Sequence, residues 1–218
     1  MEPSDKMRER RNVMEVLVIR HGQTASNATH THSGWAPIPL SETGRKQATL
    51  VGKLLKDVSF DMVYSSDLER TRETTCLAGL DKRGVPVIYS PYLREIDVGS
   101  LEGKRVEDCE CELGENYKQN RKKLDYRSYG GEDKTQLDER ISSFMRLLEG
   151  QNGRRVAVVT SEGPIFSMML YALHLDLPRS LMQLPNTAVV LLLWEDGVWK
   201  LKSWNMNAKP ETEGRLSQ

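Results

Sequence analysis

Short apolar runs rich in β-branched residues recur along the chain and predict the strands of a sheet. They lie at residues 14–20, 61–66, 85–90, 155–161 and 188–194. Most of these runs are apolar throughout instead of alternating with polar residues, which is typical of strands that are covered on both faces. The predicted sheet is therefore an internal layer with other elements packed on each side.

Two segments between the runs repeat their apolar residues with the period of a helix. Residues 41–58 open on Ser41, a favourable N-cap, and carry an apolar stripe that includes Val51. Residues 136–153 carry a second stripe and end at a glycine. Strands that alternate with helices predict an α/β fold, here a three-layer sandwich with a mainly parallel sheet and helices on both faces.

The last apolar run is followed by a turn signal. Asp196-Gly197 separates residues 188–194 from a further apolar stretch and is typical of a tight hairpin. We therefore predict one antiparallel strand at an edge of the sheet. This apolar hairpin could pair across a homodimer or cover the core of one chain, and both alternatives stay open.

Length and composition predict one domain with short extensions. A chain of 218 residues fits one fairly large domain, which we place at residues 13–207. Residues 1–12 are highly charged and predict a flexible arm, and residues 208–218 predict a flexible tail. Residues 104–135 are polar and poorly periodic, so we expect an insertion over the site or a mobile lid.

Charge and cysteine content narrow the class of partner. The chain has 31 basic and 31 acidic residues, so no overall field attracts nucleic acid or an anionic membrane. No apolar run approaches the roughly 18 residues of a membrane span, and the charged N-terminus does not resemble a signal peptide. The three cysteines are too few for a disulfide framework. We expect a cytoplasmic protein that binds neither nucleic acid nor membrane.

The end of the first predicted strand carries candidate catalytic residues. Arg20 and His21 follow the apolar run at its carboxyl end, where open α/β sheets place their ligand sites. Thr24 and Asn27 lie just beyond. A neutral imidazole can attack phosphorus as a nucleophile, and a neighbouring guanidinium offers paired donors to phosphate oxygens. A lone histidine at a strand end is usually held by backbone, but this one stands beside an arginine.

Further charged side chains follow the second and third predicted strands. Arg70 and Arg72 lie in the first turns of a helix that begins near Asp67, where free amides also favour anions. They form either a second phosphate clamp or a solvated surface. Glu95 follows the third strand and could donate a proton to a leaving alkoxide, or form an ion pair with Arg94 or another basic residue.

The fourth predicted strand leads into the stretch VAVVTSEGPIFSMML, residues 156–170, which delivers Ser161 and Glu162 to its carboxyl end. One interpretation is that these two residues cap the following helix and complement its dipole. The other is that they face the same site as His21, because ligand sites of such sheets lie outside the carboxyl ends of the strands.

Several stretches, in order along the chain, carry a family resemblance. They are RHGQTASN (20–27), GWAPIPLSETGRKQA (34–48), YSSDLERTRET (64–74), LREIDVGSLEG (93–103), YGGED (129–133) and PNTAVVLLLWEDGVWKLKSWN (185–205). In these stretches the chain resembles the histidine phosphatase superfamily, also called the phosphoglycerate mutase-like family. The resemblance runs from about residue 14 to about residue 206.

The resemblance implies a role for the candidate residues. The implied nucleophile is His21, the phosphate clamp Arg20 and Arg70, a further phosphate donor Asn27, and the general acid Glu95. Thr24 and Trp35 are further candidates for binding the substrate. Trp35, Tyr117 and Tyr126 could stack on a ring or sugar. We expect neither a metal nor a cofactor.

The chain departs from the family pattern after the fourth predicted strand. There the family carries a second histidine and then a small residue, usually glycine, where this chain has Ser161 and Glu162. The histidine normally donates a hydrogen bond to the phosphoryl group, whereas Ser161 offers a neutral bond about half as strong. If the Glu162 carboxylate lies about 4 Å from a phosphate charge, it opposes that charge by roughly 4 kcal/mol at an effective dielectric of about 20. The alternative is that Glu162 points away from the site and pairs with a neighbouring basic residue.

Three functions are compatible with the sequence. The first is hydrolysis of a small phosphorylated metabolite through a phosphohistidine on His21, without a metal. The second is recruitment of the scaffold to a different reaction, with His21 and Glu162 as acid and base. The third is a catalytically weak regulatory protein that binds phosphate. Mutases of the family that the chain resembles generally carry a longer insertion than residues 104–135, so the resemblance disfavours a mutase. The sequence does not identify the substrate.

Overall fold

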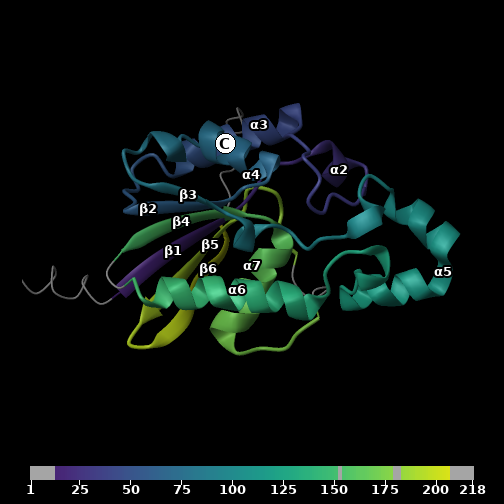
Figure 1. The fold of residues 1–218 in the computed structure, drawn as a ribbon. Coiled ribbons are helices and arrows are strands. Elements are labelled where there is room, and N and C mark those ends of the chain that lie inside the picture. The colour runs from purple at the N-terminus through teal and green to yellow at the C-terminus, as the bar shows by residue number, and fades with distance from the viewer. Residues whose placement is uncertain (1–12, 152–153, 179–182, 207–218) are drawn as a thin grey trace, which may run out of the picture.

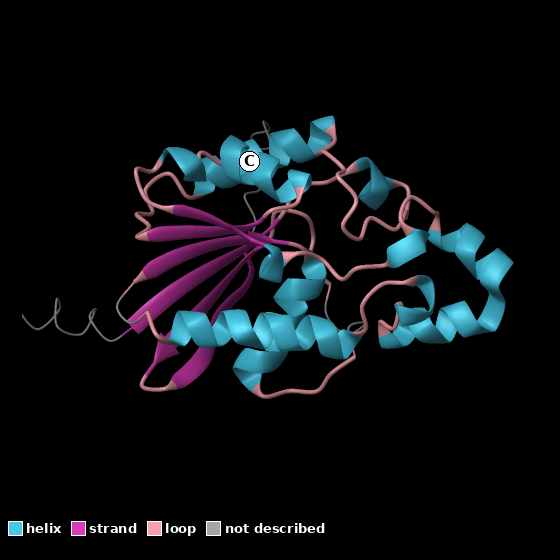
Figure 2. Ribbon diagram, in the orientation of Figure 1, coloured by secondary structure: helices cyan, strands magenta, loops and turns pink. Residues whose placement is uncertain are grey.

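The computed structural model describes residues 13–151, 154–178 and 183–206. Within these residues the chain forms a six-stranded sheet with helices on both faces (Figure 2). None of the described helices has the length and hydropathy needed to cross a membrane. The predicted arm at residues 1–12 and the predicted tail at residues 208–218 lie outside the described residues.

Strands and helices follow the order that the apolar pattern predicts. The strands are β1 (Val13–Arg20), β2 (Met62–Ser66), β3 (Val87–Ser90), β4 (Arg155–Thr160), β5 (Val189–Glu195) and β6 (Val198–Met206). The α-helices are α2 (Ala25–Ala28), α3 (Glu42–Leu54), α4 (Glu69–Leu77), α5 (Val106–Lys123), α6 (Lys134–Glu149) and α7 (Glu162–Leu173). Short 3-10 helices are η1 (Leu80–Lys82), η2 (Pro91–Leu93), η3 (Gly99–Leu101) and η4 (Arg127–Tyr129). All the predicted strands are present, with ends within two residues of those predicted.

The strands are arranged in the order β3-β2-β4-β1-β5-β6 (Figure 1). The neighbours from β3 to β1 are parallel, while β5 is antiparallel to both β1 and β6. The predicted mainly parallel sheet with an antiparallel edge is therefore confirmed. The reversed strand is β5, one position in from the edge, because Asp196 and Gly197 both have positive φ and turn the chain directly into β6.

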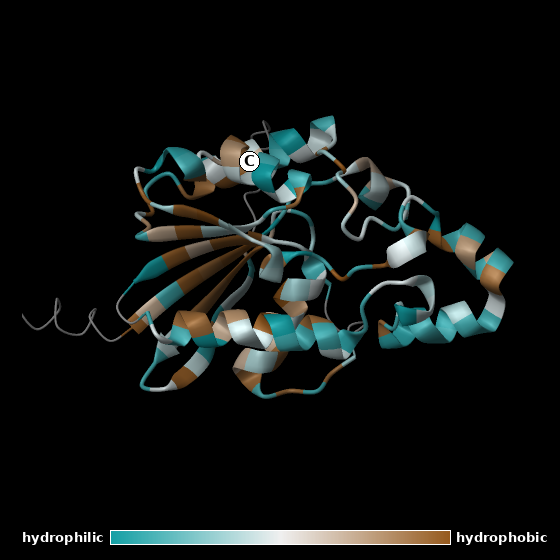
Figure 3. Cartoon of the chain, viewed as in Figure 1, coloured by the Kyte–Doolittle hydropathy of each residue, from teal (hydrophilic) through white to brown (hydrophobic). Residues whose placement is uncertain are grey.

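Successive residues of the central strands point into two different cores. In β1, Val16 and Val18 pack in the core that α6 and α7 cover, whereas Leu17 and Ile19 pack in the core that includes Val51 of α3. Figure 3 shows the apolar strands between the two layers of helices. Continuous apolar runs are therefore explained by burial on both faces.

Helix α5 lies beyond the carboxyl ends of the strands and occupies the segment predicted to be poorly periodic (Figure 1). It has a kink at Gly114, whose φ is 67°, and its buried residues are Cys109 and Tyr117. An interrupted helix with so few buried positions shows no continuous stripe in the sequence, which is why the pattern did not predict it. Its action as a lid stays a prediction.

Candidate active site

The candidate site lies where β1 and β4 end side by side. Arg20 pairs with Thr160 in the parallel register, and the His21 amide donates to the Thr160 carbonyl oxygen at 2.9 Å. The chain passes from β1 to β2 across the position that β4 later fills. Such a change in strand order opens a crevice at the carboxyl edge of an α/β sheet, and this is where ligands bind.

His21 is buried, with 4% of its surface exposed, and its ring is held in one orientation. Its Nδ1 lies 2.7 Å from the Gly22 carbonyl oxygen. A carbonyl oxygen only accepts, so Nδ1 carries the proton and Nε2 keeps its lone pair. Burial, together with the Arg70 and Arg20 guanidiniums, lowers the pKa of His21 well below its ordinary value of 6.5. The imidazole is therefore neutral at neutral pH, the form required of a nucleophile.

The turn after His21 depends on two glycines. A Cβ atom at Gly22 would clash with the Gly44 carbonyl oxygen of α3, and one at Gly44 would clash with the Gln23 carbonyl oxygen. Helix α3 begins with Ser41 as its N-cap, whose side chain accepts from the Gly44 amide at 3.1 Å. The close approach of α3 therefore fixes the backbone just after His21.

Arg70 comes from the first turn of α4 and is 1% exposed. Its Nη2 donates to the Gly34 carbonyl oxygen at 2.8 Å, and its buried Nε has no hydrogen-bond partner among the described residues. Burial lowers the pKa of Arg70, while the carboxylates of Glu95 and Glu102 act in the opposite direction. The guanidinium stays charged and retains a donor for an anion.

The other predicted arginine of α4 does not join the site. The Arg72 guanidinium lies 3.9 Å from the centre of the Tyr89 ring, and its Nε donates to the Asp67 carbonyl oxygen. Arg94 likewise forms a fork with the Asp67 carboxylate at 2.7 and 2.6 Å, so Glu95 is not its partner in these contacts. The predicted arginine pair is thus reduced to Arg70, and the pairing of Arg94 with Glu95 is replaced by pairing with Asp67.

Glu95 lies after η2 and contacts the N-terminus of α7. Its Oε1 accepts from the Ile96 amide at 2.9 Å and its Oε2 from the Gly163 amide at 3.2 Å. A Cβ atom at Gly163 would clash with Glu95 Oε1. Glycine at position 163 is therefore what allows this carboxyl group to reach the end of β4.

Ser161 is fully buried at the N-cap position of α7, yet its side chain makes no capping hydrogen bond. Its Oγ has no hydrogen-bond partner in the part of the chain that the structure describes. The capping interpretation is therefore wrong for the Ser161 side chain. A buried hydroxyl without a partner is costly, and a bound ligand could satisfy it.

Glu162 lies in the first turn of α7, where its charge complements the helix dipole. Its Oε1 is 3.4 Å from Arg20 Nη1, and the same oxygen accepts from the Leu184 amide at 3.3 Å. Arg20 Nη1 in turn donates to the Leu184 carbonyl oxygen. One of the two predicted phosphate-binding arginines is therefore engaged by a carboxylate.

Thr24 and Asn27 form a reciprocal cap on the short helix α2. The Thr24 side chain accepts from the Asn27 amide, and Asn27 Oδ1 accepts from the Thr24 amide at 3.0 Å. Asn186, which the sequence did not indicate, donates from Nδ2 to the His21 carbonyl oxygen at 3.1 Å and to Asn27 Oδ1 at 3.2 Å. Asn186 lies in the quoted motif PNT, the only signal that could have found it.

The aromatic candidates differ in their surroundings. Trp35 Nε1 donates to the Glu95 carbonyl oxygen at 2.7 Å, and the Arg94 guanidinium lies 4.7 Å from the Trp35 ring centre. These contacts brace the Glu95 loop, and stacking of Trp35 on a substrate stays a prediction. Tyr117, on α5, and Tyr126 are buried in the core that α6 and α7 cover, and their stacking on a ligand also stays a prediction.

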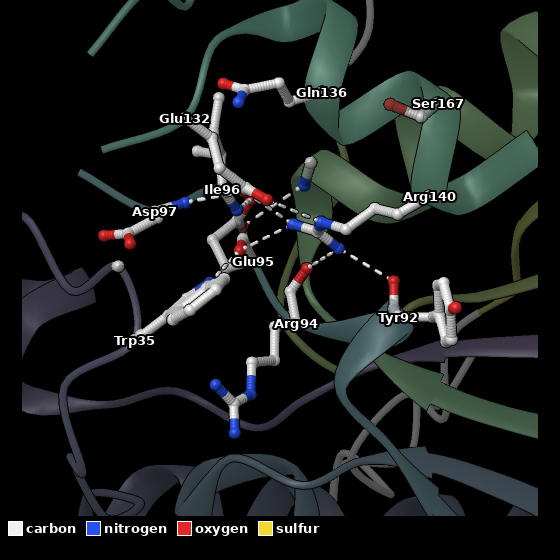
Figure 4. Close-up of polar contacts among 12 residues, drawn as sticks. Trp35, Tyr92, Arg94, Glu95, Ile96, Asp97, Glu132, Gln136, Arg140 and Ser167 are labelled. Atoms are coloured by element: carbon white, nitrogen blue, oxygen red, sulfur yellow. Dashed lines mark hydrogen bonds and ion pairs between the residues drawn. The ribbon is translucent and has the colours of Figure 1, made fainter. Parts of the chain in front are cut away.

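Further polar contacts hold the loop that carries Glu95 against α6. Arg140 of α6 and Glu132, in the YGGED motif, bond to each other and to the backbone around Glu95 (Figure 4). The sequence placed Glu132 in a family motif without assigning it a role, and nothing in the pattern marked Arg140. Both residues act on main-chain groups, which a sequence pattern does not display.

The histidines of the loop after α2 do not extend the site. His30 is exposed, while His32 is buried with its Nε2 2.5 Å from the Tyr117 hydroxyl. Over residues 13–151, 154–178 and 183–206, no three His, Cys, Asp or Glu side chains form a group suited to a metal ion. The absence of a resident metal or cofactor stays a prediction.

Comparison with known proteins identifies the class to which this fold and site belong. Residues 16–207 match the model of the histidine phosphatase superfamily (branch 1). The chain is 31% identical to phosphoglycerate mutase-like protein 4 of Arabidopsis thaliana, over 93% of this chain and 89% of that protein. It is also 31% identical to a metal-independent phosphoserine phosphatase of Arabidopsis thaliana, over 93% of this chain and 85% of that protein.

A solved structure agrees with this assignment. The alpha-ribazole phosphatase from Shigella flexneri matches with a TM-score of 0.78 at 28% identity, covering 88% of this chain and 96% of that chain. The protein belongs to the histidine phosphatase superfamily, whose members among its relatives include phosphatases and phosphoglycerate mutase-like proteins.

Proposed function

We propose that the protein hydrolyses a small phosphomonoester through a phosphohistidine on His21. In the first step, the His21 Nε2 lone pair attacks phosphorus and the bond to the ester oxygen breaks. Glu95 donates a proton to the departing oxygen, which leaves as an alcohol. In the second step, water attacks the phosphohistidine, Glu95 takes its proton, and inorganic phosphate and neutral His21 result.

The observation that carries this proposal is the state of the His21 ring. Its Nδ1 is fixed on the Gly22 carbonyl oxygen, and burial beside two guanidiniums lowers its pKa. A carboxylate that charged this imidazole for acid–base work would raise the pKa instead. The direction of the shift therefore favours a neutral nucleophile over the alternative in which His21 and Glu162 act as acid and base.

Phosphate binding in this proposal uses Arg20, Arg70 and the Ser161 hydroxyl. Arg70 Nε and Ser161 Oγ are buried polar atoms without a hydrogen-bond partner among the described residues, so a phosphoryl group would satisfy both. Asn27 and Thr24 line the same turn as His21. The names of two relatives, a phosphoserine phosphatase and an alpha-ribazole phosphatase, support a small phosphorylated substrate.

The Arg20–Glu162 ion pair favours a second candidate, a regulatory protein that binds phosphate weakly and turns over poorly. Arg20 Nη1 lies 3.4 Å from Glu162 Oε1, and the Arg20 and Glu162 side chains are 13% and 24% exposed. A phosphate that binds Arg20 must displace this carboxylate, and the two anions then repel each other. Glu162 therefore lowers phosphate affinity in either candidate function.

The deciding experiment is turnover of 4-nitrophenyl phosphate in the presence of a chelator. Native protein is compared with His21→Ala and with the double variant Ser161→His, Glu162→Gly. We expect native turnover that His21→Ala abolishes, and acid-labile phosphate on His21 after rapid quenching. Turnover by the double variant alone would contradict hydrolysis by the native protein and would favour a regulatory role or a different reaction. Loss of native turnover in chelator, restored by a divalent metal, would contradict the metal-independent mechanism.

A further inference from the structure

The guanidinium of Arg140, on α6, donates hydrogen bonds to the backbone of the loop that carries Glu95. Its Nη1 donates to the carbonyl oxygens of Tyr92 at 2.7 Å and Arg94 at 2.6 Å, and its Nη2 donates to that of Glu95 at 2.9 Å (Figure 4). The side chain thus binds three carbonyl groups of the loop that follows β3. Trp35 Nε1 donates to the Glu95 carbonyl oxygen from the opposite side of this loop.

Glu132 completes the arrangement. It accepts from Arg140 Nε at 3.0 Å and from Arg140 Nη2 at 2.9 Å, and its Oε2 also accepts from the Asp97 amide at 3.0 Å. All five N–H groups of the guanidinium are therefore engaged by protein oxygens. The two side chains are 12% and 15% exposed, so solvent screens the pair little. Arg140 has no donor left for a ligand.

The contacts span the loop on both sides of Glu95, from Tyr92 to Asp97. The Glu95 carboxyl group, in turn, is held by the Ile96 and Gly163 amides. A catalytic group displaced by about 1 Å can cost about a hundredfold in rate, so a backbone fixed in this way matters for proton transfer.

We propose that Arg140, paired with Glu132, is the positioning residue for the proton donor of this site. It holds the backbone of residues 92–97 in the position that lets the Glu95 carboxyl group contact the N-terminus of α7. The inference rests on the proposed function, in which Glu95 protonates the leaving group. Lysine cannot replace Arg140, because a single ammonium cannot reproduce the planar fork that reaches three carbonyls and a carboxylate.

The test compares Arg140→Lys with native protein on two esters that differ in their need for an acid. Phenyl phosphate has a basic leaving group that needs the proton, whereas 2,4-dinitrophenyl phosphate has a leaving group that departs without it. We expect kcat/KM for phenyl phosphate to fall about a hundredfold, and kcat/KM for the dinitrophenyl ester to stay nearly unchanged. A merely structural role would lower both equally and would overturn the inference.

Three further variants sharpen the comparison. Glu95→Gln should show the same dependence on the leaving group, and adding Arg140→Lys to it should cause little further loss, because both act through one proton transfer. Arg146→Lys is the matched control, since Arg146 lies on the same helix and donates to Ser143 instead. An additive double variant would contradict the assignment of Arg140 to Glu95.

Hydrogen exchange separates this inference from the proposed function. The Ile96 and Gly163 amides, both bonded to the Glu95 carboxylate, should exchange faster in Arg140→Lys than in native protein and in Arg146→Lys. If native protein hydrolyses neither ester, the proposed function is wrong, and these two amides alone decide whether Arg140 holds Glu95. Unchanged exchange would refute the positioning role.

Discussion

In the proposed function, two adjacent residues at the start of α7 have opposite effects on the site. The Glu162 carboxylate forms an ion pair with Arg20 and would compete with a bound anion for that guanidinium. The Gly163 amide donates to the Glu95 carboxylate, and the absence of a side chain at Gly163 leaves room for that contact. In that proposal, one turn of helix holds both the residue that would weaken phosphate binding and the glycine that leaves room for the proposed proton donor.

Gly163→Ala should lower activity with little effect on stability. A Cβ atom at this position clashes with the end of the flexible Glu95 side chain, which can swing away at low energetic cost. Alanine is favoured over glycine in helices by up to about 1 kcal/mol, which offsets part of that cost. We expect kcat/KM for phenyl phosphate to fall about a hundredfold, and the thermal midpoint to move by only a few degrees.

Gly150→Ala is the control for this substitution. Gly150 caps the end of α6 with a φ of −75°, and a Cβ atom there would lie 3.6 Å from the Leu147 carbonyl oxygen, an ordinary contact. It should leave activity unchanged. If Gly163→Ala retains full activity, the position of the Glu95 carboxyl group at α7 is not required for turnover.

At the scale of elements, the sequence predicts strands better than it predicts α5. Strands such as β4 are buried on both faces and therefore read as unbroken apolar runs. Helix α5 buries only Cys109 and Tyr117 and is interrupted at Gly114, so no period is visible. Its packing depends on His32, from a loop more than 70 residues earlier, which no local pattern reveals.

His32 makes the attachment of α5 sensitive to acid. Burial, with a smaller contribution from Arg121, lowers the pKa of His32 to about 4. Between its unfolded pKa near 6.5 and about 4, the unfolded chain binds a proton that the folded chain does not. Folding stability therefore falls as the pH drops through this window, by at most about 3 kcal/mol from this residue.

The measurement is chemical denaturation of native protein and His32→Gln between pH 7 and pH 4. The native chain is more stable at pH 7, because its imidazole bonds to Tyr117, and this advantage should shrink by up to about 3 kcal/mol on acidification. His30→Gln serves as the control, since His30 is exposed at the same loop. A constant difference between native and His32→Gln would contradict a buried neutral imidazole.

At the scale of the whole molecule, the sequence located the edge of the sheet at which the site forms, but not its supports. Arg20 and Ser161 end predicted strands and Glu95 follows one, so topology alone brings them toward one edge. Asn186 and Arg140 act through main-chain carbonyls of distant segments. Such contacts exist only once the layers have packed, and no spacing in the sequence encodes them.

The candidate site joins the two halves of the molecule, so an occupying anion should stabilise the whole fold. Arg70 comes from the layer of α3 and α4, Ser161 from the opposite layer, and His21 from the sheet between them. Inorganic phosphate at about a hundred times its dissociation constant adds about 2.7 kcal/mol to the free energy of unfolding, which raises the thermal midpoint of a chain this size by roughly 5–10 °C.

Arg70→Gln should lose most of this shift. Arg72→Gln should keep it, because Arg72 lies two residues further along α4 and contacts Tyr89 instead. Equal shifts in all three proteins would mean that phosphate binds elsewhere, since only removal of Arg70 takes a buried donor from the site at the end of β1.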